Sequence, residues 1–467
     1  MKYIYYINMR LALFVSALLW LTGCAVKGEP PLLRLQSGPQ GGSAITSSPL
    51  EYHLESTGYR SCGWKAANAV GAEVSSGTCS PQRSNVFDCR VSLPAPGRYT
   101  VTFTAVAGAS AAQVVVADLD YRPRYGGAYP EMDDPTAAIA EGWGAWGGSP
   151  VADPETWDFI KDNAKKGEIT LYRPVVVPAP RPAVFFISGW GREAATYEQL
   201  FRFIASKGFV VVDVYNEDPG DINNTYPNAL AMIREAVARY PGWFDTTRVG
   251  IMGHSLGGGM AFWMAVKLFA GEGWGANGRF IFTSAPWYTF LTRAADLASV
   301  PADTKVLLQA YEEDLHTDPE IYQLVYRLLP TPDAEKDFVY VRSGSAGERD
   351  YHANHFVSYT GATTQWDPVH YEPYDRLDSY AINRLLDALM AYAFDGDLEA
   401  KAVALGGGAA EQVDMGPLPP LEVSDDPDHH NAEVDYTYVC KDDNDEGWDD
   451  VVCEGGTHCW LLQDSCR

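Results

Sequence analysis

Residues 248–257 read RVGIMGHSLG, an apolar run that ends in the pattern G-x-S-x-G around Ser255. The run is typical of a short buried strand, and residues 256–270 are typical of a helix. Gly253 and Gly257 flank the serine where larger side chains would collide with the strand and the helix in a tight turn. The bare pattern is common by chance. Between a strand and a helix, however, it predicts a nucleophile elbow that presents the serine hydroxyl above a sheet.

Short apolar runs alternate with helical stretches on both sides of this motif. The runs lack strict polar alternation, which is typical of strands buried on both faces, and they cover 183–188, 208–215, 248–252, 279–284, 305–310 and 337–342. The helical stretches lie near 193–206, 226–240, 256–270, 319–329 and 375–394. This alternation predicts an α/β fold, with a doubly wound and mostly parallel sheet, over residues 151–405.

An acid is expected after the run 305–310. A serine hydroxyl needs a general base at neutral pH, and the base needs a group that orients it. In α/β-hydrolases the chain order is serine, acid, histidine. Asp314 is the acid we expect, and three other acidic residues remain as alternatives: Glu312, Glu313 and Asp318.

The general base is expected after the last parallel strand, where two histidines lie close together. We favour His355 and keep His352 as the alternative. His254 is adjacent to the nucleophile, so we expect it to pack beside the elbow rather than act as the base. His316, next to the acid, could line the pocket, but we favour its exposure to solvent.

Ester or amide hydrolysis also needs hydrogen-bond donors for the oxyanion, and two backbone N–H groups suffice. Leu256, immediately after the nucleophile, is expected to supply one of them. Trp190 is expected to supply the other, because Gly189 and Gly191 on either side allow the loop to curl over the site.

Several segments together resemble the bacterial cutinase and PET hydrolase group, which is related to dienelactone-hydrolase-like and chlorophyllase-like esterases. The resemblance spans about residues 165–400 and rests on six segments in order: 187–191 (ISGWG), 204–211 (IASKGFVV, like "ASHGFVV"), 253–259 (GHSLGGG, like "GHSMGGGG"), 285–287 (APW, like "TPW"), 310–314 (AYEED, like "GAEED") and 353–356 (ANHF, like "ASHF"). The ordered set is far more specific than any single segment.

The resemblance implies an α/β-hydrolase fold and a role for each matching residue. It implies Ser255 as nucleophile, His355 as base, Asp314 as orienting acid, Leu256 and Trp190 as oxyanion donors, and Trp190 with Trp287 as an aromatic clamp on the substrate. The chain departs from the group in three places. Its oxyanion loop lacks the proline of "SPGF" and is one residue shorter, the stretch 344–354 is longer and more polar, and residues 357–374 add an aromatic insertion that could overhang the cleft. These departures leave the identity of the substrate open, but they do not affect the implied catalytic chemistry.

The N-terminus has the features of an export signal. The apolar run 11–21 follows Lys2 and Arg10 and is too short for a comfortable membrane span. Residues 21–24 (LTGC) resemble a bacterial lipobox, so we expect cleavage after residue 23 and lipidation of Cys24. Because Ala25 is not the aspartate associated with inner-membrane retention, the outer membrane of the bacterial envelope is the expected location.

The chain carries a net charge of −26, and residues 1–23 contain two positive and no negative charges, so removing them gives −28. A surface this acidic repels nucleic acid and anionic headgroups, and neither is an expected partner. The length and the 46% of hydrophobic residues suffice for two or three domains with a large core.

Smaller modules are expected around the catalytic region. Residues 24–44 are expected to be a tether, and residues 45–120 an all-β sandwich, because 93–101 (LPAPGRYTV) resembles a strand entry of bacterial immunoglobulin-like modules. Such a module is expected to act as a spacer or a binding arm. Residues 121–150 are expected to be a linker packed on the catalytic domain, and 406–467 an acidic linker with a disulfide-stapled tail.

The cysteines flank the expected catalytic region and leave residues 90–439 free of them. In an oxidising compartment they indicate disulfides. The front group, Cys62, Cys79 and Cys89, is odd in number, so one thiol is free or paired elsewhere. The tail group can close two bridges and consists of Cys440, Cys453, Cys459 and Cys466.

Two motifs in the tail invite metal interpretations. Residues 442–447 resemble the start of a calcium loop, but Cys453 stands where the loop would have a glutamate. His458 beside Cys459 suggests zinc, although disulfides are favoured in an oxidising compartment. We therefore expect neither a metal site nor a cofactor.

The combined expectation is an exported, lipid-anchored, monomeric serine carboxylic-ester hydrolase. The implied aromatic clamp favours bulky or polymeric esters of the cutin, polyester or lipid type. One alternative is a small-ester or carbohydrate acetyl esterase, which would prefer acetyl over longer acyl groups. Another is a non-catalytic surface-binding lipoprotein on a hydrolase scaffold, which would have no use for Ser255, Asp314 and His355 together.

Overall fold

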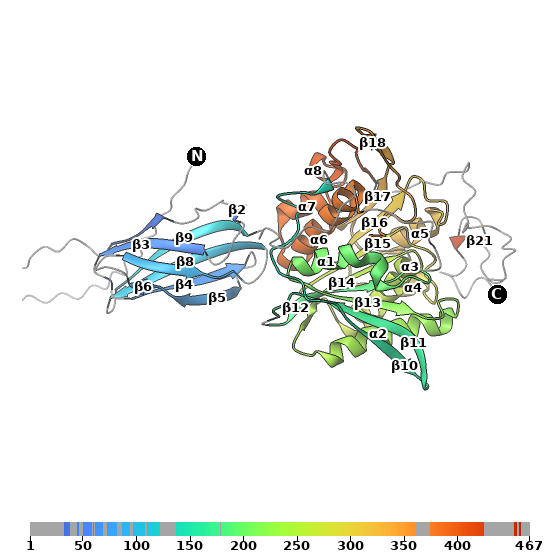
Figure 1. Ribbon diagram of the computed structural model, residues 1–467, viewed down its shortest axis with the longest axis horizontal. Helices are drawn as coiled ribbons and strands as arrows, with labels where there is room; N and C mark the ends of the chain where they lie inside the picture. The colour runs from blue at the N-terminus through green and yellow to red at the C-terminus, as the bar shows by residue number, and fades with distance from the viewer. Residues whose placement is uncertain are drawn as a thin grey trace, which may run out of the picture. The chain divides into compact units, whose positions relative to one another are not determined.

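The computed structural model (Figure 1) divides the chain into two compact units, Met1–Pro123 and Arg124–Arg467. The residues that it describes are 32–37, 44–45, 50–57, 59, 61–68, 72–81, 86–93, 97–107, 110–121, 137–177, 179–360, 374–424, 453–454 and 457–458. Each unit has its own hydrophobic core, and each is described here by itself.

The first unit consists of two sheets around one core. One sheet has the order β1-β3-β7-β6 and the other β2-β9-β8-β4-β5. Their bounds are Leu32–Ser37 (β1), Ala44–Ile45 (β2), Leu50–Thr57 (β3), Ser61–Asn68 (β4), Glu73–Thr78 (β5), Ser80–Pro81 (β6), Val86–Val91 (β7), Gly97–Ala107 (β8) and Ser110–Tyr121 (β9). Alternate residues of β4 and β7 are buried, as in strands with one face on a core. Tyr52, Trp64 and Phe103 are among the aromatic side chains buried in this core.

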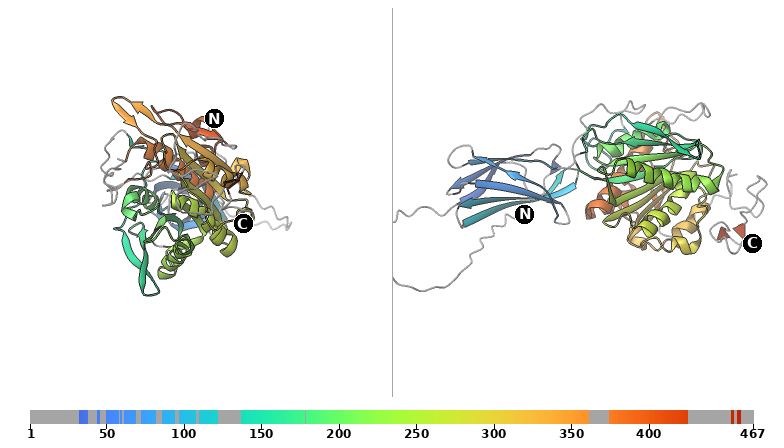
Figure 2. Two further views of the ribbon diagram at one scale, coloured as in Figure 1. Left: turned by 90° about the vertical axis from the view of Figure 1, so that its right-hand side faces the viewer. Right: turned by 90° about the horizontal axis from the view of Figure 1, so that it is seen from below.

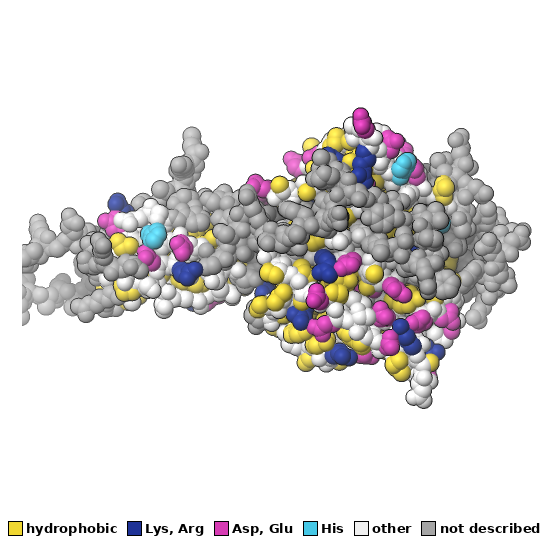
Figure 3. Space-filling model, in the orientation of Figure 1, with side chains coloured by type: hydrophobic (Ala, Val, Ile, Leu, Met, Phe, Trp, Pro, Cys, Tyr) yellow, Lys and Arg dark blue, Asp and Glu magenta, His cyan; other side chains and the backbone are white. Residues whose placement is uncertain are grey.

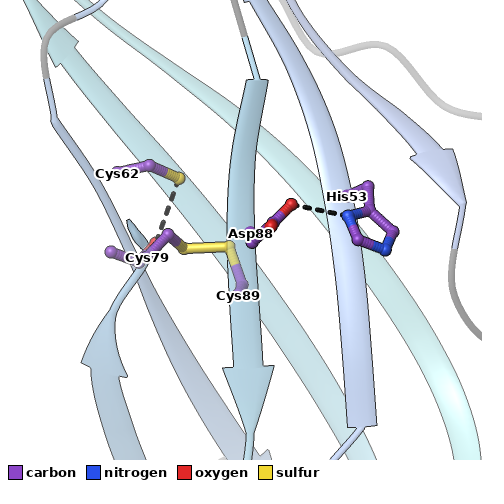
Figure 4. Close-up of a disulfide and its surroundings, with 6 residues drawn as sticks. His53, Cys62, Cys79, Asp88 and Cys89 are labelled. Atoms are coloured by element: carbon purple, nitrogen blue, oxygen red, sulfur yellow. Dashed lines mark hydrogen bonds and ion pairs between the residues drawn. A yellow bond between two sulfur atoms is a disulfide. The ribbon is translucent and has the colours of Figure 1, made fainter. Parts of the chain in front are cut away.

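A disulfide joins the two sheets of the first unit (Figure 4). Cys79, at the end of β5, is bonded to Cys89 of β7 with an S–S distance of 2.01 Å. Cys62 of β4 is the remaining thiol of the front group and is buried, which raises its pKa to about 11. The structure thereby resolves the pairing that the sequence leaves open.

The second unit is built on a nine-stranded sheet with the order β10-β11-β13-β12-β14-β15-β16-β17-β20. The six strands from β13 to β17 in this order are parallel, whereas β10, β11 and β20 are antiparallel to their neighbours. Their bounds are Glu155–Lys161 (β10), Ala164–Tyr172 (β11), Arg181–Ile187 (β12), Val210–Asn216 (β13), Phe244–His254 (β14), Gly278–Ser284 (β15), Lys305–Tyr311 (β16), Lys336–Val341 (β17) and Glu422–Ser424 (β20). The expectation of a mostly parallel sheet in a mixed α/β chain is confirmed.

Helices cover both faces of this sheet because alternate strand residues point to opposite sides (Figure 2). Val184 and Phe186 of β12 pack with α1 (Glu198–Ser206) and α6 (Arg384–Asp395). Phe185 and Ile187 pack with the helices of the opposite face, which are α2 (Ile222–Arg239), α3 (Leu256–Ala265) and α5 (Glu320–Leu328). The apolar composition of the predicted strands follows from this double coverage.

Shorter elements complete the described residues. They are η2 (Ala194–Tyr197), η3 (Val266–Gly271), α4 (Ala294–Leu297), η4 (Asp333–Glu335), β18 (Gly344–Ala346), β19 (Arg349–Tyr351), η5 (Leu377–Asn383), α7 (Leu398–Ala404), α8 (Ala410–Val413), β21 (Cys453–Glu454) and β22 (Thr457–His458). The elements η3 and η5 are π-helical, so the expected helices 256–270 and 375–394 each contain a change of helix type.

The strands at the two edges of the sheet were not predicted from the sequence. The hairpin β10–β11 is rich in charged residues and has only one buried face over much of its length, so it lacks the apolar signal of the central strands. Strand β20 has three residues and pairs with β17 beyond residue 405, where a linker was expected. Within 121–150, the described residues 137–150 pack on this unit: Trp146 is buried in its core, and the Gly147 N–H donates to Ser206 Oγ (2.8 Å).

Charged side chains on the face shown in Figure 3 are mixed in sign. Asp and Glu lie among Lys and Arg over the second unit, without one continuous patch of either charge on the visible face. Within the described residues, no helix has the length and apolar character needed to cross a membrane. Several expectations fall outside the described residues, namely those on 1–23, Cys24, Cys440, 442–447, Cys459, Cys466 and the side chains of Cys453 and His458.

Candidate active site

Ser255 lies in a strained turn between the end of β14 and the start of α3. Its backbone has φ 54° and ψ −121°, in the region that residues other than glycine rarely adopt. Such strain costs on the order of 1–3 kcal/mol and persists only where the surroundings hold it. Here the Ser255 N–H donates to the Ser284 carbonyl (3.1 Å), and the Ser255 carbonyl accepts the Trp287 N–H (2.7 Å). The turn is therefore held from the next strand and the loop after it.

The glycines after the serine are required by close backbone approach. A Cβ at Gly257 would lie 1.9 Å from the Ile187 carbonyl oxygen, and one at Gly259 would lie 2.2 Å from the Tyr288 carbonyl oxygen. The end of β12 and the loop after β15 thus pack directly on the first turn of α3. This arrangement brings the expected oxyanion loop against the elbow.

Asp314 and His355 form a buried pair, with 2.9 Å between Asp314 Oδ2 and His355 Nδ1. Asp314 follows β16, and three further hydrogen bonds hold its carboxylate: N–H groups of His316 (2.7 Å) and Thr317 (3.0 Å) and the Thr317 hydroxyl (2.7 Å). Burial alone would raise the pKa of this carboxyl, but His355 and the Thr317 donors outweigh it and hold the pKa below its ordinary value. An ionised Asp314 keeps the proton of His355 on Nδ1 and leaves Nε2 as the basic atom.

The His355 loop is attached directly to the elbow. His254 Nε2 lies 2.8 Å from the His355 carbonyl oxygen, and the two imidazole centroids are 4.8 Å apart. Between these described residues, no hydrogen bond joins the Ser255 hydroxyl to the His355 ring. Nucleophile and base commonly close this last contact only when substrate is bound.

The expected catalytic residues and their alternatives lie in different surroundings. His352 pairs with Glu313 (2.9 Å), but both side chains are exposed, to 60% and 43%. Glu312 pairs with Arg342 (3.0 Å) at the edge of β17. Asp318 is buried at the start of α5, where it accepts the Glu320 N–H (3.0 Å). None of these alternatives is bonded to the His355 ring.

The loop after β12 carries Trp190, the second expected oxyanion donor. Gly191 has φ 65°, a left-handed conformation that supports the sharp curl of the loop. The Gly189 N–H points elsewhere and donates to the Tyr197 hydroxyl (3.1 Å). Leu256, the other expected donor, begins α3 and has a buried side chain.

The two expected clamp residues differ in exposure. Trp190 and Trp287 have ring centroids 6.0 Å apart at 73°, so they are in edge contact. Trp190 is 42% exposed, whereas Trp287 is 4% exposed and continues into a cluster with Tyr288 and Phe290. Of the two rings, Trp190 is therefore the one exposed to solvent, and Trp287 is the buried ring in contact with it.

Around the site, Tyr197 had no assigned role in the sequence, and Tyr359 entered only as part of the aromatic insertion 357–374. Tyr197 lies at the end of η2 and contacts His254, and Tyr359 packs against both rings at centroid distances of 5.5 and 5.3 Å. His316, expected to be exposed, is half-buried with its ring 4.8 Å from that of His355. Tyr197 and Tyr359 lie in segments distant from Ser255, Asp314 and His316 in the sequence, and no spacing links them to the site.

The expected aromatic insertion begins next to the residues that follow the expected oxyanion loop. The Thr360 N–H donates to the Thr196 carbonyl (2.8 Å), and Thr360 Oγ1 accepts the Gln199 N–H (3.1 Å). Residues 361–373 lie outside the described part of the chain. The first residues of the expected insertion are thus fixed to η2 and α1.

Potential metal ligands do not gather at this site. Within the described residues, the group of His, Cys, Asp or Glu with ligand atoms close together is Cys62, Cys79 and Cys89 in the first unit, two of which form the disulfide. Comparison with known proteins adds no assignment: no family model matches the chain, and no curated protein matches its sequence. The candidate function consequently rests on the geometry around Ser255.

Proposed function

We propose that the chain is a serine carboxylic-ester hydrolase of the α/β-hydrolase type. The observation that carries this proposal is the strained Ser255 turn at the end of a parallel strand, next to a buried Asp314–His355 pair. Ser255 follows β14, Asp314 follows β16, and His355 follows β17 and the hairpin β18–β19. This serine, acid, histidine order is that of α/β-hydrolases.

In the proposed mechanism the Ser255 hydroxyl attacks the ester carbonyl while His355 Nε2 accepts its proton. Asp314 holds the Nδ1–H and stabilises the imidazolium that forms. The N–H groups of Leu256 and Trp190 donate to the oxyanion, and the N-terminus of α3 adds a favourable dipole. His355 then protonates the departing alcohol, and water releases the acyl group by the same route.

The solvent-exposed ring of Trp190 favours esters with bulky, polymeric or aromatic groups as substrates. An exposed indole beside the nucleophile offers apolar contact area without a closed pocket wall. We further propose that the first unit is an immunoglobulin-like spacer and that lipid on Cys24 anchors the chain to the bacterial envelope, both suggested by sequence alone. Loss of labelled-palmitate incorporation in Cys24→Ser would test the anchor.

The proposed activity is tested with p-nitrophenyl acetate, butyrate, octanoate and palmitate. We expect turnover that disappears in Ser255→Ala and persists in Ser299→Ala. Ser299 is a suitable control because it is exposed and its hydroxyl donates to the Asp296 carbonyl in the adjacent helix α4. A fluorophosphonate should add to the wild-type chain, with the adduct at Ser255 by mass spectrometry. Background rates and no adduct would overturn the proposal, while an acetyl optimum would favour an acetyl esterase.

A further inference from the structure

We propose that Tyr197 and His254 form a buried positioning relay, which aligns the oxyanion loop and the general base with the elbow. This inference rests on the proposed function and adds two residues that act through others. Tyr197 comes from η2 and His254 from the last position of β14. Both side chains are fully buried, and neither is a member of the triad.

Three hydrogen bonds connect the relay from end to end. The Gly189 N–H lies 3.1 Å from the Tyr197 hydroxyl oxygen. That oxygen lies 3.0 Å from His254 Nδ1, and His254 Nε2 lies 2.8 Å from the His355 carbonyl oxygen. The relay therefore joins the loop that precedes Trp190 to the residue that carries the base.

The direction of these bonds follows from the chemistry of their ends. A carbonyl oxygen only accepts, so His254 Nε2 must carry its proton. In the neutral ring Nδ1 is then an acceptor, and the Tyr197 hydroxyl donates to it while accepting the Gly189 N–H. Burial and the neighbouring His355 lower the pKa of His254 well below its ordinary value, which keeps the ring neutral and this direction fixed.

Close packing leaves the relay little freedom. A Cβ at Gly189 would lie 3.0 Å from both His254 Nδ1 and the Tyr197 oxygen, so the glycine backbone sits directly on the pair. The Tyr197 ring packs against Phe186 at 4.7 Å and against Tyr359 at 5.5 Å. The hydroxyl is thus held in place by ring contacts that do not depend on its hydrogen bonds.

The relay fixes His355 at a second point. Asp314 holds the imidazole through Nδ1, and His254 holds the backbone carbonyl of the same residue. Two anchors on opposite ends of one residue restrict the direction in which Nε2 points. A displacement of about 1 Å in such a group can cost roughly 100-fold in rate.

The first test is Tyr197→Phe, which keeps the ring and removes the hydroxyl. Tyr326→Phe is the matched control, because Tyr326 is equally buried and its hydroxyl donates to the Lys336 carbonyl (3.1 Å) at the first residue of β17. With p-nitrophenyl butyrate we expect Tyr197→Phe to lower kcat roughly 10- to 100-fold with little change in KM. Unchanged kcat, or equal losses in both variants, would overturn the relay.

The second test separates the two ends of His254. In His254→Gln the amide reaches the position of Nε2 and can still donate to the His355 carbonyl, whereas in His254→Asn it reaches only the position of Nδ1. Since the His355 anchor aligns the base, we expect His254→Gln to keep at least several-fold more kcat than His254→Asn. Equal activity of the two variants, or wild-type activity in His254→Asn, would contradict the proposal.

A measurement without ester hydrolysis keeps this inference apart from the proposed function. In ¹⁵N-histidine spectra of the full chain, assigned with His254→Gln, we expect His254 to remain the neutral Nε2–H tautomer from pH 5 to 8. A titrating His254 or the Nδ1–H tautomer would overturn the relay even if the enzyme is active. A wild-type chain without Ser255-dependent turnover would instead overturn the proposed function, and the tautomer would still decide whether the relay exists.

Discussion

Two carboxylate–imidazole pairs lie side by side in this molecule and differ mainly in their surroundings. Asp314–His355 and Glu313–His352 have the same 2.9 Å separation, and their acids are consecutive in sequence. The first pair is buried beside the elbow, and its carboxylate accepts three further hydrogen bonds. The second pair is exposed to water, which weakens the interaction between its side chains. The contrast shows that burial and additional donors, rather than residue type or spacing, distinguish a candidate catalytic pair from a surface ion pair.

The largest expected effect comes from the two histidines. His355→Ala should lower kcat by roughly 10⁴- to 10⁶-fold, because the proposed nucleophile loses its base. His352→Ala should stay within about twofold of the wild type, since its partner is an exposed surface acid. Steady-state hydrolysis of p-nitrophenyl butyrate measures both variants. If His352→Ala were the inactive one, the assignment of the base would be reversed.

The two acids provide the next comparison. Asp314→Asn keeps the shape of the side chain but no longer favours the Nδ1–H tautomer of His355, so we expect kcat to fall by about 10³- to 10⁴-fold. Glu313→Gln should change kcat little. A pH–rate profile of each variant checks that the loss does not come from a shifted optimum. Similar activity of the two variants would remove Asp314 from the proposed mechanism.

A third carboxyl group shows how burial shifts the pKa when too few hydrogen bonds reach the carboxylate. Asp213 of β13 is buried like Asp314, but Oδ1 accepts the Ser188 hydroxyl (2.7 Å), and Oδ2 has no partner within the described residues. Burial raises its pKa to about 8, in the direction opposite to that of Asp314.

Because the two pKa values are shifted in opposite directions, Asp213 and Asp314 should make opposite contributions to the dependence of the free energy of unfolding on pH. Between about pH 4 and 8 the folded chain holds the Asp213 proton that the unfolded chain releases, so the free energy of unfolding falls as pH rises through this window. Asp213→Asn should remove that contribution and increase the free energy of unfolding at pH 8 by a few kcal/mol. Urea unfolding at pH 5 and pH 8 measures the change. A wild-type slope retained in Asp213→Asn would show that other groups cause it.

The smallest effect is expected from the exposed pair. Because both side chains face water, Glu313→Gln should change the free energy of unfolding by about 0.5 kcal/mol or less, and added salt should reduce even that. Thermal unfolding at low and high salt measures it. A loss of several kcal/mol would mean that this pair holds the acid and base loops together, beyond the backbone bond from Glu313 N–H to the Ala353 carbonyl.

The sequence alone determined those features that depend on local chemistry. Apolar runs buried on both faces predicted the parallel strands, and the G-x-S-x-G pattern placed Ser255 between a strand and a helix. The edge hairpin β10–β11 and the short β20 were missed because pairing, not composition, makes them strands. The unequal exposure of Trp190 and Trp287 was also not predicted, because the burial of Trp287 depends on which segments pack around it.

Tertiary structure shows differences between adjacent or equivalent residues that the sequence leaves open. Asp314 and His355 form a buried pair, whereas their neighbours Glu313 and His352 form an exposed one. Cys62 became the odd thiol because Cys79 and Cys89 meet across the two sheets. The Tyr197–His254 contact joins residues 57 positions apart. A sequence pattern carries information over the few residues that share a turn or a strand, whereas burial and hydrogen bonding depend on which distant segments the fold brings together.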